Sequence, residues 1–302
     1  MAERDVGAAV APAQLTRVQV QPAGQGTGAL DQVLKVVAYV VLIAVTLVMF
    51  VPFSFTLVTS LKTNQEANNL TFRTIFWPDN PTLDAYRTVF DADVGQWFAN
   101  SALVAVLWVF GRCVFDTMAG YAFARMQFPG RQIVFLAILS TLMVPGIVLI
   151  IPRFLILDRL NLLNSYGALT IPFVSSAFGI FLMKQFFESI PGELEEAARV
   201  DGANRFRMFA QIILPNTMPA LITLTIFTFQ ASWNAFLEPL IYISNSDFYT
   251  LPLGLAFFRY EFKTDWPTQM AIAVITTVPI AIFFIVFQRY FVESNASSGI
   301  KG

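Results

Sequence analysis

The chain has 302 residues, of which 56% are hydrophobic and only 13% are charged. About a quarter of the residues in a soluble domain are charged, so this composition excludes a soluble globular protein and predicts a membrane protein. The formal net charge of −1 and the lack of a dense basic run argue against nucleic acid as a partner.

The first third of the chain predicts a tail, one membrane span and an outer loop. Residues 1–33 show no sustained apolar period, which is typical of a disordered tail. The uncharged run from Val36 to Leu61 exceeds the ~20 residues that cross a bilayer and is too long for a signal peptide. The polar segment 62–96 contains one helical apolar period, at Leu83, Tyr86 and Phe90, and is interpreted as an extracytoplasmic loop with one amphipathic helix.

Five further apolar runs complete the predicted fold, an all-α polytopic membrane protein with six transmembrane helices in a domain of residues 34–290. These runs extend over about Trp97–Gly111 (continuing to Ala124), Gln132–Pro152, Leu160–Met183, Asn216–Leu237 and Trp266–Gln288. With both termini inside, eleven of the 19 Lys and Arg residues fall in inner segments and seven in outer ones. This bias follows the positive-inside rule and places residues 191–215 in the cytoplasm.

The segment 191–215 is the most charged stretch between two long apolar runs. Pro191 and the acidic side chains that follow it favour a helix start, and Glu195 and Arg199 are spaced for an i,i+4 pair. Gly202 is suited to a left-handed cap, and a second apolar period leads to a break at Pro215. The sequence therefore predicts a helix with Leu194, Ala197 and Ala198 on one face, a glycine corner and another helix.

The same segment carries a family resemblance. Glu196-Ala197-Ala198, Gly202, Ile212 and Leu214-Pro215 have the spacing of the "EAA" motif of ABC-importer permeases. Residues 35–302 resemble the carbohydrate-uptake branch, in particular the six-helix second permease of maltose-type transporters. Supporting motifs are Ser60-Leu61-Lys62-Thr63, Asn100-Ser101, Tyr121-Ala122-Phe123-Ala124-Arg125, Trp233-Asn234-Ala235-Phe236 and Ser298-Gly299-Ile300-Lys301-Gly302.

The resemblance implies a subunit of a bacterial plasma-membrane sugar importer. Its partners would be a second, homologous permease in a heterodimer, two ATP-binding subunits, an extracytoplasmic solute-binding protein, the sugar and the lipid bilayer. Residues 191–215 would form a coupling segment that docks into an ATP-binding subunit, with Glu196, Ala197, Ala198, Asp201, Gly202, Leu214 and Pro215 as its functional residues. The C-terminal tail, residues 291–302, would bring Ser298 and Gly299 close to the nucleotide site.

The residues present exclude an energy source within the chain itself. None of its lysines follows a glycine, so it has no Walker motif to cradle phosphates. It also has no histidine and a single cysteine, Cys113, which leaves no metal cluster and no obvious catalytic pair. We therefore expect a transporter subunit, not an enzyme, with no cofactor of its own and with ATP-Mg bound and hydrolysed by partner subunits.

The fifth predicted span is unusually polar for a membrane helix. Its hydroxyls can bond back to the helix backbone or join helices, which is the simpler explanation for any one of them. As a set, amides beside an aromatic ring suit a neutral polyol. The residues assigned to the substrate pathway on this ground are Thr228, Gln230, Trp233 and Asn234.

Two charges in the second predicted span leave alternatives open. Arg112 and Asp116 are spaced one helical turn apart, and the simpler interpretation is a mutually neutralising pair that faces a neighbouring helix. Asp116 is also the one membrane-embedded acid that a secondary carrier could use, although the sequence shows no inverted repeat. A permease for glycerol phosphate or another polar solute would favour Arg112 in its path. Neither a channel nor an intramembrane enzyme has a recognisable motif here.

Overall fold

The computed structural model describes residues 29–261 and 265–298, and every regular element in them is helical, as the composition predicted. The chain divides into two compact units, residues 1–52 and 53–302. Each unit is described by itself.

The first unit contains most of α1 (Ala29–Ser60), which begins seven residues before the predicted span. Its large apolar side chains are exposed all around the helix, including Tyr39 at 66% and Val48 at 73%. A helix that is apolar on every face requires lipid or another protein chain around it. The predicted tail lies largely outside the described residues, and its last part, residues 29–33, is helical.

The second unit begins with the end of α1 and three short helices: α2 (Asn64–Asn68), α3 (Phe72–Phe76) and α4 (Asp84–Asp91). The amphipathic helix predicted near residues 83–90 is α4. The sequence did not predict α2 or α3, each of which depends on a threonine cap that is local to the loop. The Thr63 hydroxyl accepts from the Glu66 N–H at 3.3 Å, and Thr71 forms a capping box with Thr74.

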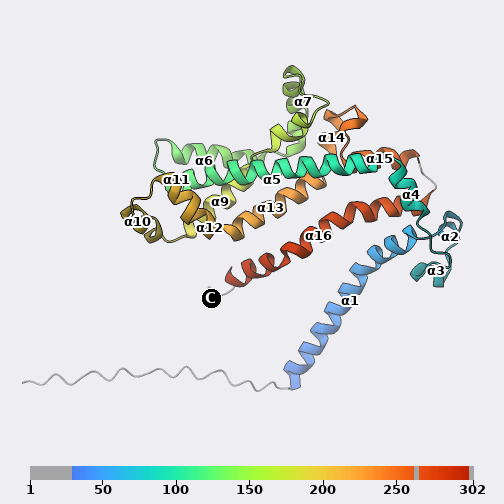
Figure 1. Ribbon diagram of the computed structural model, residues 1–302. Coiled ribbons are helices and arrows are strands. Elements are labelled where there is room, and N and C mark those ends of the chain that lie inside the picture. Colours follow the sequence, from blue (N-terminus) through green and yellow to red (C-terminus); the bar gives the residue numbers. More distant parts are fainter. Residues whose placement is uncertain (1–28, 262–264, 299–302) are drawn as a thin grey trace, which may run out of the picture. The chain divides into compact units, whose positions relative to one another are not determined.

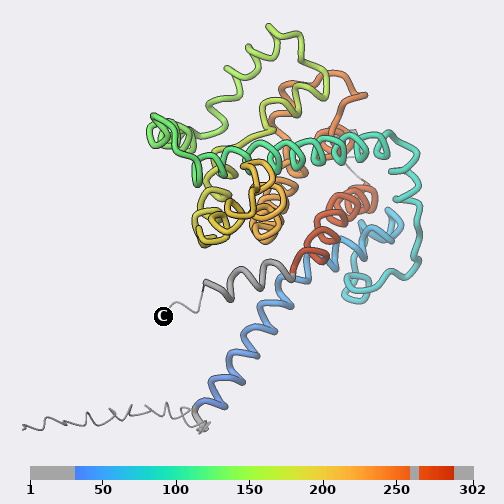
Figure 2. The backbone as a smooth tube through the Cα atoms, turned by 60° about the vertical axis from the view of Figure 1, so that its left-hand side comes forward, coloured from blue at the N-terminus to red at the C-terminus, as the bar shows by residue number. Residues whose placement is uncertain are grey.

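The long helix α5 (Val94–Arg125) organises the second unit, with α9 (Ala177–Ser189) and α13 (Met218–Trp233) along its length (Figures 1 and 2). Two glycines allow the close approach of α5 to the segment 174–189. A Cβ at Gly111 would lie 2.7 Å from Val174 Cβ, and one at Gly120 would lie 2.7 Å from Met183 Cβ. Such distances leave room for no larger residue, so these glycines set the packing distance between the helices.

Two of the predicted spans, Gln132–Pro152 and Leu160–Met183, are bent, whereas the sequence predicted unbroken runs, and a third bend lies at Thr217, at the start of the predicted span Asn216–Leu237. The bent pairs are Arg131–Met143 with Gly146–Arg159 at 99°, Tyr166–Phe173 with Ala177–Ser189 at 41°, and Arg205–Asn216 with Met218–Trp233 at 76°. Pro145 lies within the first break, and Pro172 and Pro219 lie two residues from the second and third breaks. A proline lacks the N–H that would continue a helix. The described residues contain three helices that are long and apolar enough to cross a membrane, or up to six spans if each bent pair is one.

The remaining helices lie between and beyond these spans. The first bent pair contains α6 (Arg131–Ser140), η1 (Thr141–Met143), η2 (Gly146–Leu149) and α7 (Ile150–Arg159), and the second begins with α8 (Tyr166–Thr170) and η3 (Ile171–Phe173). After α13 come α14 (Leu237–Tyr242), η5 (Ser246–Phe248), α15 (Leu251–Glu261) and α16 (Trp266–Ser298). Helix α16 thus extends into the predicted C-terminal tail.

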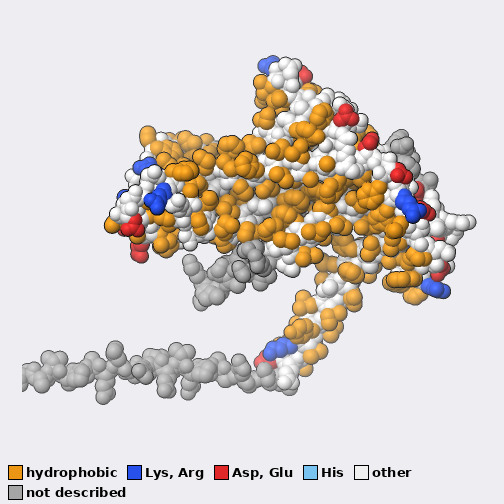
Figure 3. Space-filling view, in the orientation of Figure 1, with side chains coloured by type: hydrophobic (Ala, Val, Ile, Leu, Met, Phe, Trp, Pro, Cys, Tyr) orange, Lys and Arg blue, Asp and Glu red, His pale blue; other side chains and the backbone are white. Residues whose placement is uncertain are grey.

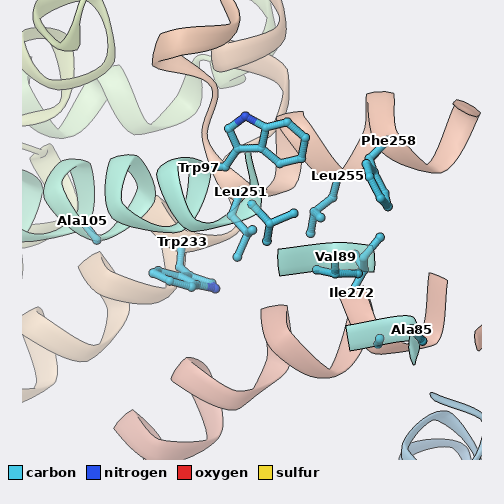
Figure 4. Close-up of a cluster of buried hydrophobic side chains, with 11 residues drawn as sticks. Ala85, Val89, Trp97, Ala105, Trp233, Leu251, Leu255, Phe258 and Ile272 are labelled. Atoms are coloured by element: carbon cyan, nitrogen blue, oxygen red, sulfur yellow. The ribbon is translucent and has the colours of Figure 1, made fainter. Parts of the chain in front are cut away.

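The two ends of α5 carry different structures, which we call the α10 end and the α15 end (Figure 1). At the α15 end, buried residues of α4, α5, α13, α15 and α16 form one cluster around Trp97 and Trp233 (Figure 4). Apolar side chains cover much of the visible face of this unit, and charged ones gather toward its ends and on α7 (Figure 3). This distribution is that of a membrane domain with two polar ends.

Candidate functional site

The helix and the glycine corner predicted from the sequence are both present at the α10 end. Helix α10 (Glu193–Val200) carries three glutamates in its first turn, where the helix dipole favours negative charge. It ends at Gly202, which has a φ of +79°, and the Ala203 N–H donates to the Ala198 carbonyl at 2.9 Å. The glycine corner is therefore a left-handed helix cap.

The next helix begins at Asn204, whose side-chain oxygen accepts from the Arg207 N–H at 2.8 Å. It continues from α11 (Arg205–Met208) through a π-helical turn, η4 (Phe209–Ile213), into α12 (Leu214–Asn216). The predicted break at Pro215 is wrong by two residues, because a proline fits the first turn of α12 and the chain bends at Thr217. Leu214 and Pro215 therefore lie at the end of the helical segment that precedes the bend.

The face of α10 that packs against the rest of the unit differs from the predicted one. Glu195 and Ala198 are buried, at 9% and 5% exposure, whereas Leu194 and Ala197 are exposed. Glu195 pairs with Arg125 of α5, Oε1 to Nε 3.2 Å, and not with Arg199 as the i,i+4 spacing suggested. The reason is that Glu195 points inward, toward the end of α5.

Arg125 is the anchor of this end of the molecule. Besides Glu195, its guanidinium donates to the carbonyl of Phe187 at 2.6 Å and to that of Ile190, at the end of α9. Arg125 belonged to one of the supporting sequence motifs, but neither it nor Glu195 was assigned a role. Their contact is between residues 70 positions apart, so no local pattern reveals it.

An aromatic cluster lies beneath the same anchor. Tyr121 packs edge-on against Phe187 at 5.6 Å and against Phe209 at 4.9 Å, and its hydroxyl is 4.0 Å from the Met208 sulfur. Moving this segment away from α5 would cost free energy, because α9 and η4 would both have to separate from α5 and the packed rings would become exposed. The segment 191–215 is thus fixed to two spans at once.

The opposite face of α10 is open to solvent. Glu196, Ala197, Asp201 and Gly202 are all exposed, whereas the predicted docking residue Ala198 is not available because it packs inside the unit. Three apolar residues are exposed near the same corner: Leu194 at 43%, Val200 at 88% and Phe206 at 76%. Exposed apolar side chains among charged ones are typical of a protein interaction site.

A polar cavity of about 430 Å³ separates α10 and α11 from the end of α5. Its lining includes Arg125, Glu195, Arg199, Asn204 and Arg205, so arginines outnumber acids around it. The cavity lies beside Glu195 at the base of α10. The tip of α10, by which we mean its exposed end from Val200 to Gly202, projects away from α5.

The four residues predicted for the substrate pathway do not lie together. Trp233 is 1% exposed, stacks on Phe229 and donates its indole N–H to the Thr276 carbonyl at 3.1 Å, and Thr228 is fully buried. Both belong to the packing between helices in this conformation. Gln230 and Asn234 are exposed, and the Asn234 amide donates to the Gln230 carbonyl at 2.9 Å.

The exposed ring on α13 is Phe227, at 45%, which sequence reasoning did not single out. Phe227, Gln230, Ala231 and Asn234 recur at helical spacing and form one exposed face. Gln230 and Asn234 follow Phe227 by three and seven residues, which is the spacing of one helix face. This spacing was present in the sequence and could have identified the face.

The two predicted charges in α5 are not in direct contact. Among the described residues, the Arg112 guanidinium and the Asp116 carboxylate form no ion pair, and each instead bonds to the segment between η3 and α9. At the C-terminus, Gly299 and the side chain of Ser298 lie outside the described residues. The described residues hold no group of three or more His, Cys, Asp or Glu side chains suited to a metal ion.

Comparison with known families decides the class of this protein. Residues 116–295 match the family "Binding-protein-dependent transport system inner membrane component". The chain is also 37% identical, over 76% of its length and 82% of the relative's, to an arabinooligosaccharides transport system permease protein of Halalkalibacterium halodurans. This chain belongs to that permease family. The matched range includes α10 and its glycine corner.

Two further similarities extend over most of the permease. It is 35% identical to a sulfoquinovosyl glycerol transport system permease protein of Agrobacterium fabrum, over 83% of this chain and 88% of that one. A crystal structure of a bacterial ABC transporter involved in the import of the acidic polysaccharide alginate aligns with a TM-score of 0.78 and 25% identity. The alignment covers 87% of this chain and 98% of that chain. The permease therefore has the ABC-importer permease fold and is a multi-pass component of the inner membrane.

Proposed function

We propose that this permease is one of two membrane subunits of an ATP-driven sugar importer. The observation that carries the proposal is the tip of α10, which is exposed, partly apolar and fixed to α5 and α9 by Arg125. A rigid projection of this kind can transmit a displacement to the spans that hold it. The transport systems of similar permeases, for arabinooligosaccharides and sulfoquinovosyl glycerol, support a carbohydrate as the substrate class.

In this proposal α10 docks into an ATP-binding subunit. Glu196 and Asp201 supply negative charge on the exposed face, and Val200 and Phe206 supply apolar surface that becomes buried on docking. Two such subunits bind and hydrolyse ATP-Mg, and both termini of the permease lie on their side of the membrane, in the cytoplasm. The C-terminal residues Ser298 and Gly299 then extend toward the nucleotide site.

The translocation path is proposed to lie between this permease and a second, homologous one. The exposed face of α13 contributes to it, because Gln230 and Asn234 can bond sugar hydroxyls and Phe227 can cover an apolar sugar face. An extracytoplasmic solute-binding protein delivers the sugar at the α15 end. The other membrane-facing surfaces contact lipid.

The contacts of Asp116 and Arg112 bear on the alternative functions. The carboxylate of Asp116 already accepts three hydrogen bonds from Ser175 and Ser176, which leaves it unsuited to ion coupling in a secondary carrier. Arg112 donates to the Phe173 carbonyl and lies over the Trp108 ring, so it is engaged with the protein and supplies no argument of its own for glycerol phosphate. The alternative of glycerol phosphate as substrate rests instead on an sn-glycerol-3-phosphate transport system permease protein of Shigella flexneri, which is 35% identical over 66% of this chain.

Affinity purification of the tagged permease in mild detergent tests this function. We expect a second permease and an ATP-binding subunit to copurify with ATPase activity. Gly202→Pro or Glu196→Lys should abolish transport in variants that still insert in the membrane. A permease that purifies alone, or normal uptake by both variants at normal abundance, would overturn the proposal.

A further inference from the structure

The break between η3 and α9 divides one span into two half-helices inside the membrane domain. The first half ends at Phe173 and the second begins at Ala177, with a bend of 41° between them. A break of this kind leaves backbone carbonyls without partners on one side and backbone N–H groups without partners on the other. In a membrane, water is not available to satisfy them.

Asp116 of α5 accepts hydrogen bonds from the start of the second half. Its carboxylate is fully buried and accepts from the Ser176 N–H at 2.9 Å, from the Ser175 hydroxyl at 2.6 Å and from the Ser176 hydroxyl at 3.0 Å. The Ser176 hydroxyl in turn caps α9 by accepting from the Gly179 N–H at 3.0 Å. Gly179 has no room for a side chain, because a Cβ there would overlap the Asp116 carboxylate.

Arg112 of α5 donates a hydrogen bond to a backbone carbonyl at the end of the first half. Its Nε donates to the Phe173 carbonyl at 3.0 Å, and its guanidinium lies 5.2 Å from the centroid of the Trp108 ring. Trp108 stacks on Phe173 at 4.4 Å and donates its indole N–H to the Leu169 carbonyl at 2.6 Å. The end of the first half is therefore held by a cation and an aromatic stack from the same helix.

The signs of the two charges match the two helix ends. A helix C-terminus carries partial negative charge and favours a cation, whereas a helix N-terminus favours an anion. Arg112 and Asp116 are one turn apart on α5, about 20 and 14 Å along the helix from Arg125 at 1.5 Å per residue. Both therefore lie well inside the membrane domain, on the same helix as Arg125, which anchors α10.

We propose that Arg112 and Asp116 are positioning residues that clamp the two halves of the broken span to α5 independently, so that α5 and this span move as one body when α10 is displaced. The proposal rests on the coupling function proposed above and assigns the intramembrane part of the transmission. Arg125 receives the displacement at the α10 end, and the clamp carries it to the middle of the membrane.

The decisive measurement is the number of sugar molecules transported per ATP hydrolysed, on the complete transporter in proteoliposomes. Asp116→Ala should keep its copurifying ATP-binding subunit and its ATPase activity within about threefold, yet transport at least tenfold less sugar per ATP. Asp116→Asn keeps an acceptor oxygen for Ser175 and Ser176 and should restore coupling to within about threefold of wild type. Thr117→Val is the matched control, since Thr117 is equally buried on α5 and its hydroxyl has no hydrogen-bond partner among the described residues.

Two outcomes would overturn the clamp while leaving the proposed function intact. One is a wild-type coupling ratio in Asp116→Ala. The other is a parallel loss of ATPase and transport, which would indicate a merely structural role. If Asp116→Ala does not fold, Ser175→Ala removes one of the three hydrogen bonds and should lower the coupling ratio severalfold. Failure of the ATP-binding subunit to copurify with the wild-type permease would instead refute the proposed function.

A double-variant comparison tests the independence of the two clamps. Because Arg112 and Asp116 bond to different half-helices, the fold-losses in coupling of Arg112→Gln and Asp116→Ala should multiply within about twofold in the double variant. If the double variant is no worse than the more severe single one, the two residues act as one ion pair and the proposed arrangement is wrong.

Discussion

Two adjacent glutamates of α10 allow the anchoring of the coupling segment to be measured separately from its docking. Glu195 is buried against Arg125, whereas Glu196 is exposed and forms no ion pair with another described residue. Both are in the first turn of α10, so Glu195→Ala and Glu196→Ala change helix propensity and dipole interactions by similar amounts. The difference between the variants therefore isolates the contact with Arg125.

The expected size of this difference follows from the burial of the pair. The side chains of Arg125 and Glu195 are 17% and 12% exposed. An exposed ion pair contributes about 0–1 kcal/mol and breaking a buried one costs about 3–5 kcal/mol, so this partly buried pair should contribute about 2 kcal/mol. Because about 1.4 kcal/mol is a factor of ten, that corresponds to a roughly 30-fold change in local opening.

Hydrogen exchange over residues 193–203 of the purified permease measures this opening directly. Glu195→Ala should lose roughly 30-fold in amide protection there, and Glu196→Ala should change by less than about threefold while still losing coupled transport. Equal protection in the two variants would show that Arg125 does not hold α10. A greater loss in Glu196→Ala would show that the assignment of inner and outer faces is inverted.

Three further predictions concern other parts of the fold. Lys62 is buried, and its ammonium group has no hydrogen-bond partner in the part of the chain that the structure describes. Burial lowers its pKa, so the unfolded chain binds the proton more tightly, and the melting temperature of the wild type should rise as pH increases from neutral toward the ordinary lysine pKa. Lys62→Met should be at least as stable and should lack this rise. A falling wild-type melting temperature over that range would contradict it. Gly202→Ala places a side chain at a φ of +79° and should cost about 1 kcal/mol in local stability, seen as faster exchange of residues 200–204 with α5 unaffected. Trp233→Ala should lower the free energy of unfolding by about 3–5 kcal/mol, measured as a lower melting temperature. Asn234→Ala should change sugar transport with little change in melting temperature. The reverse pattern would show that Trp233 is a pathway residue.

The features that the sequence predicts well are those that depend on nearby residues. Apolar runs longer than a bilayer indicated the long helices α1, α5 and α16, and a glycine after an acidic helix indicated the corner at Gly202. Hydropathy does not distinguish a straight span from a bent one of the same composition. The 99° bend near Pro145 is therefore visible in the sequence only as a proline within an apolar run.

The partners of charged residues could not be predicted, because they depend on contacts between distant segments. The i,i+4 spacing suggested that Glu195 pairs with Arg199 and Arg112 with Asp116. In the structure Glu195 pairs with a residue 70 positions away, and Asp116 bonds to a segment about 60 positions away. Spacing along one helix shows only which side chains of that helix are within reach. The packing of other helices against α5 brings partners from distant parts of the sequence closer than these.

Trp233 illustrates the same limit for aromatic residues. A tryptophan next to an asparagine in a polar span suits a sugar site, but composition does not show which face of a helix is covered. The chain buries Trp233 between α5 and α16 and exposes Phe227, Gln230 and Asn234.

Cysteine crosslinking tests most directly that the tip of α10 docks on an ATP-binding subunit. In a Cys113→Ser background, Val200→Cys places one thiol on the tip, where Val200 is 88% exposed. Phe72→Cys, at 84% exposure on α3, is the matched control at the opposite end of the unit. With a short bifunctional crosslinker on intact membranes, Val200→Cys should give a product that contains the ATP-binding subunit, and Phe72→Cys should give none. The opposite result, or the absence of that product in Val200→Cys, would contradict the coupling account.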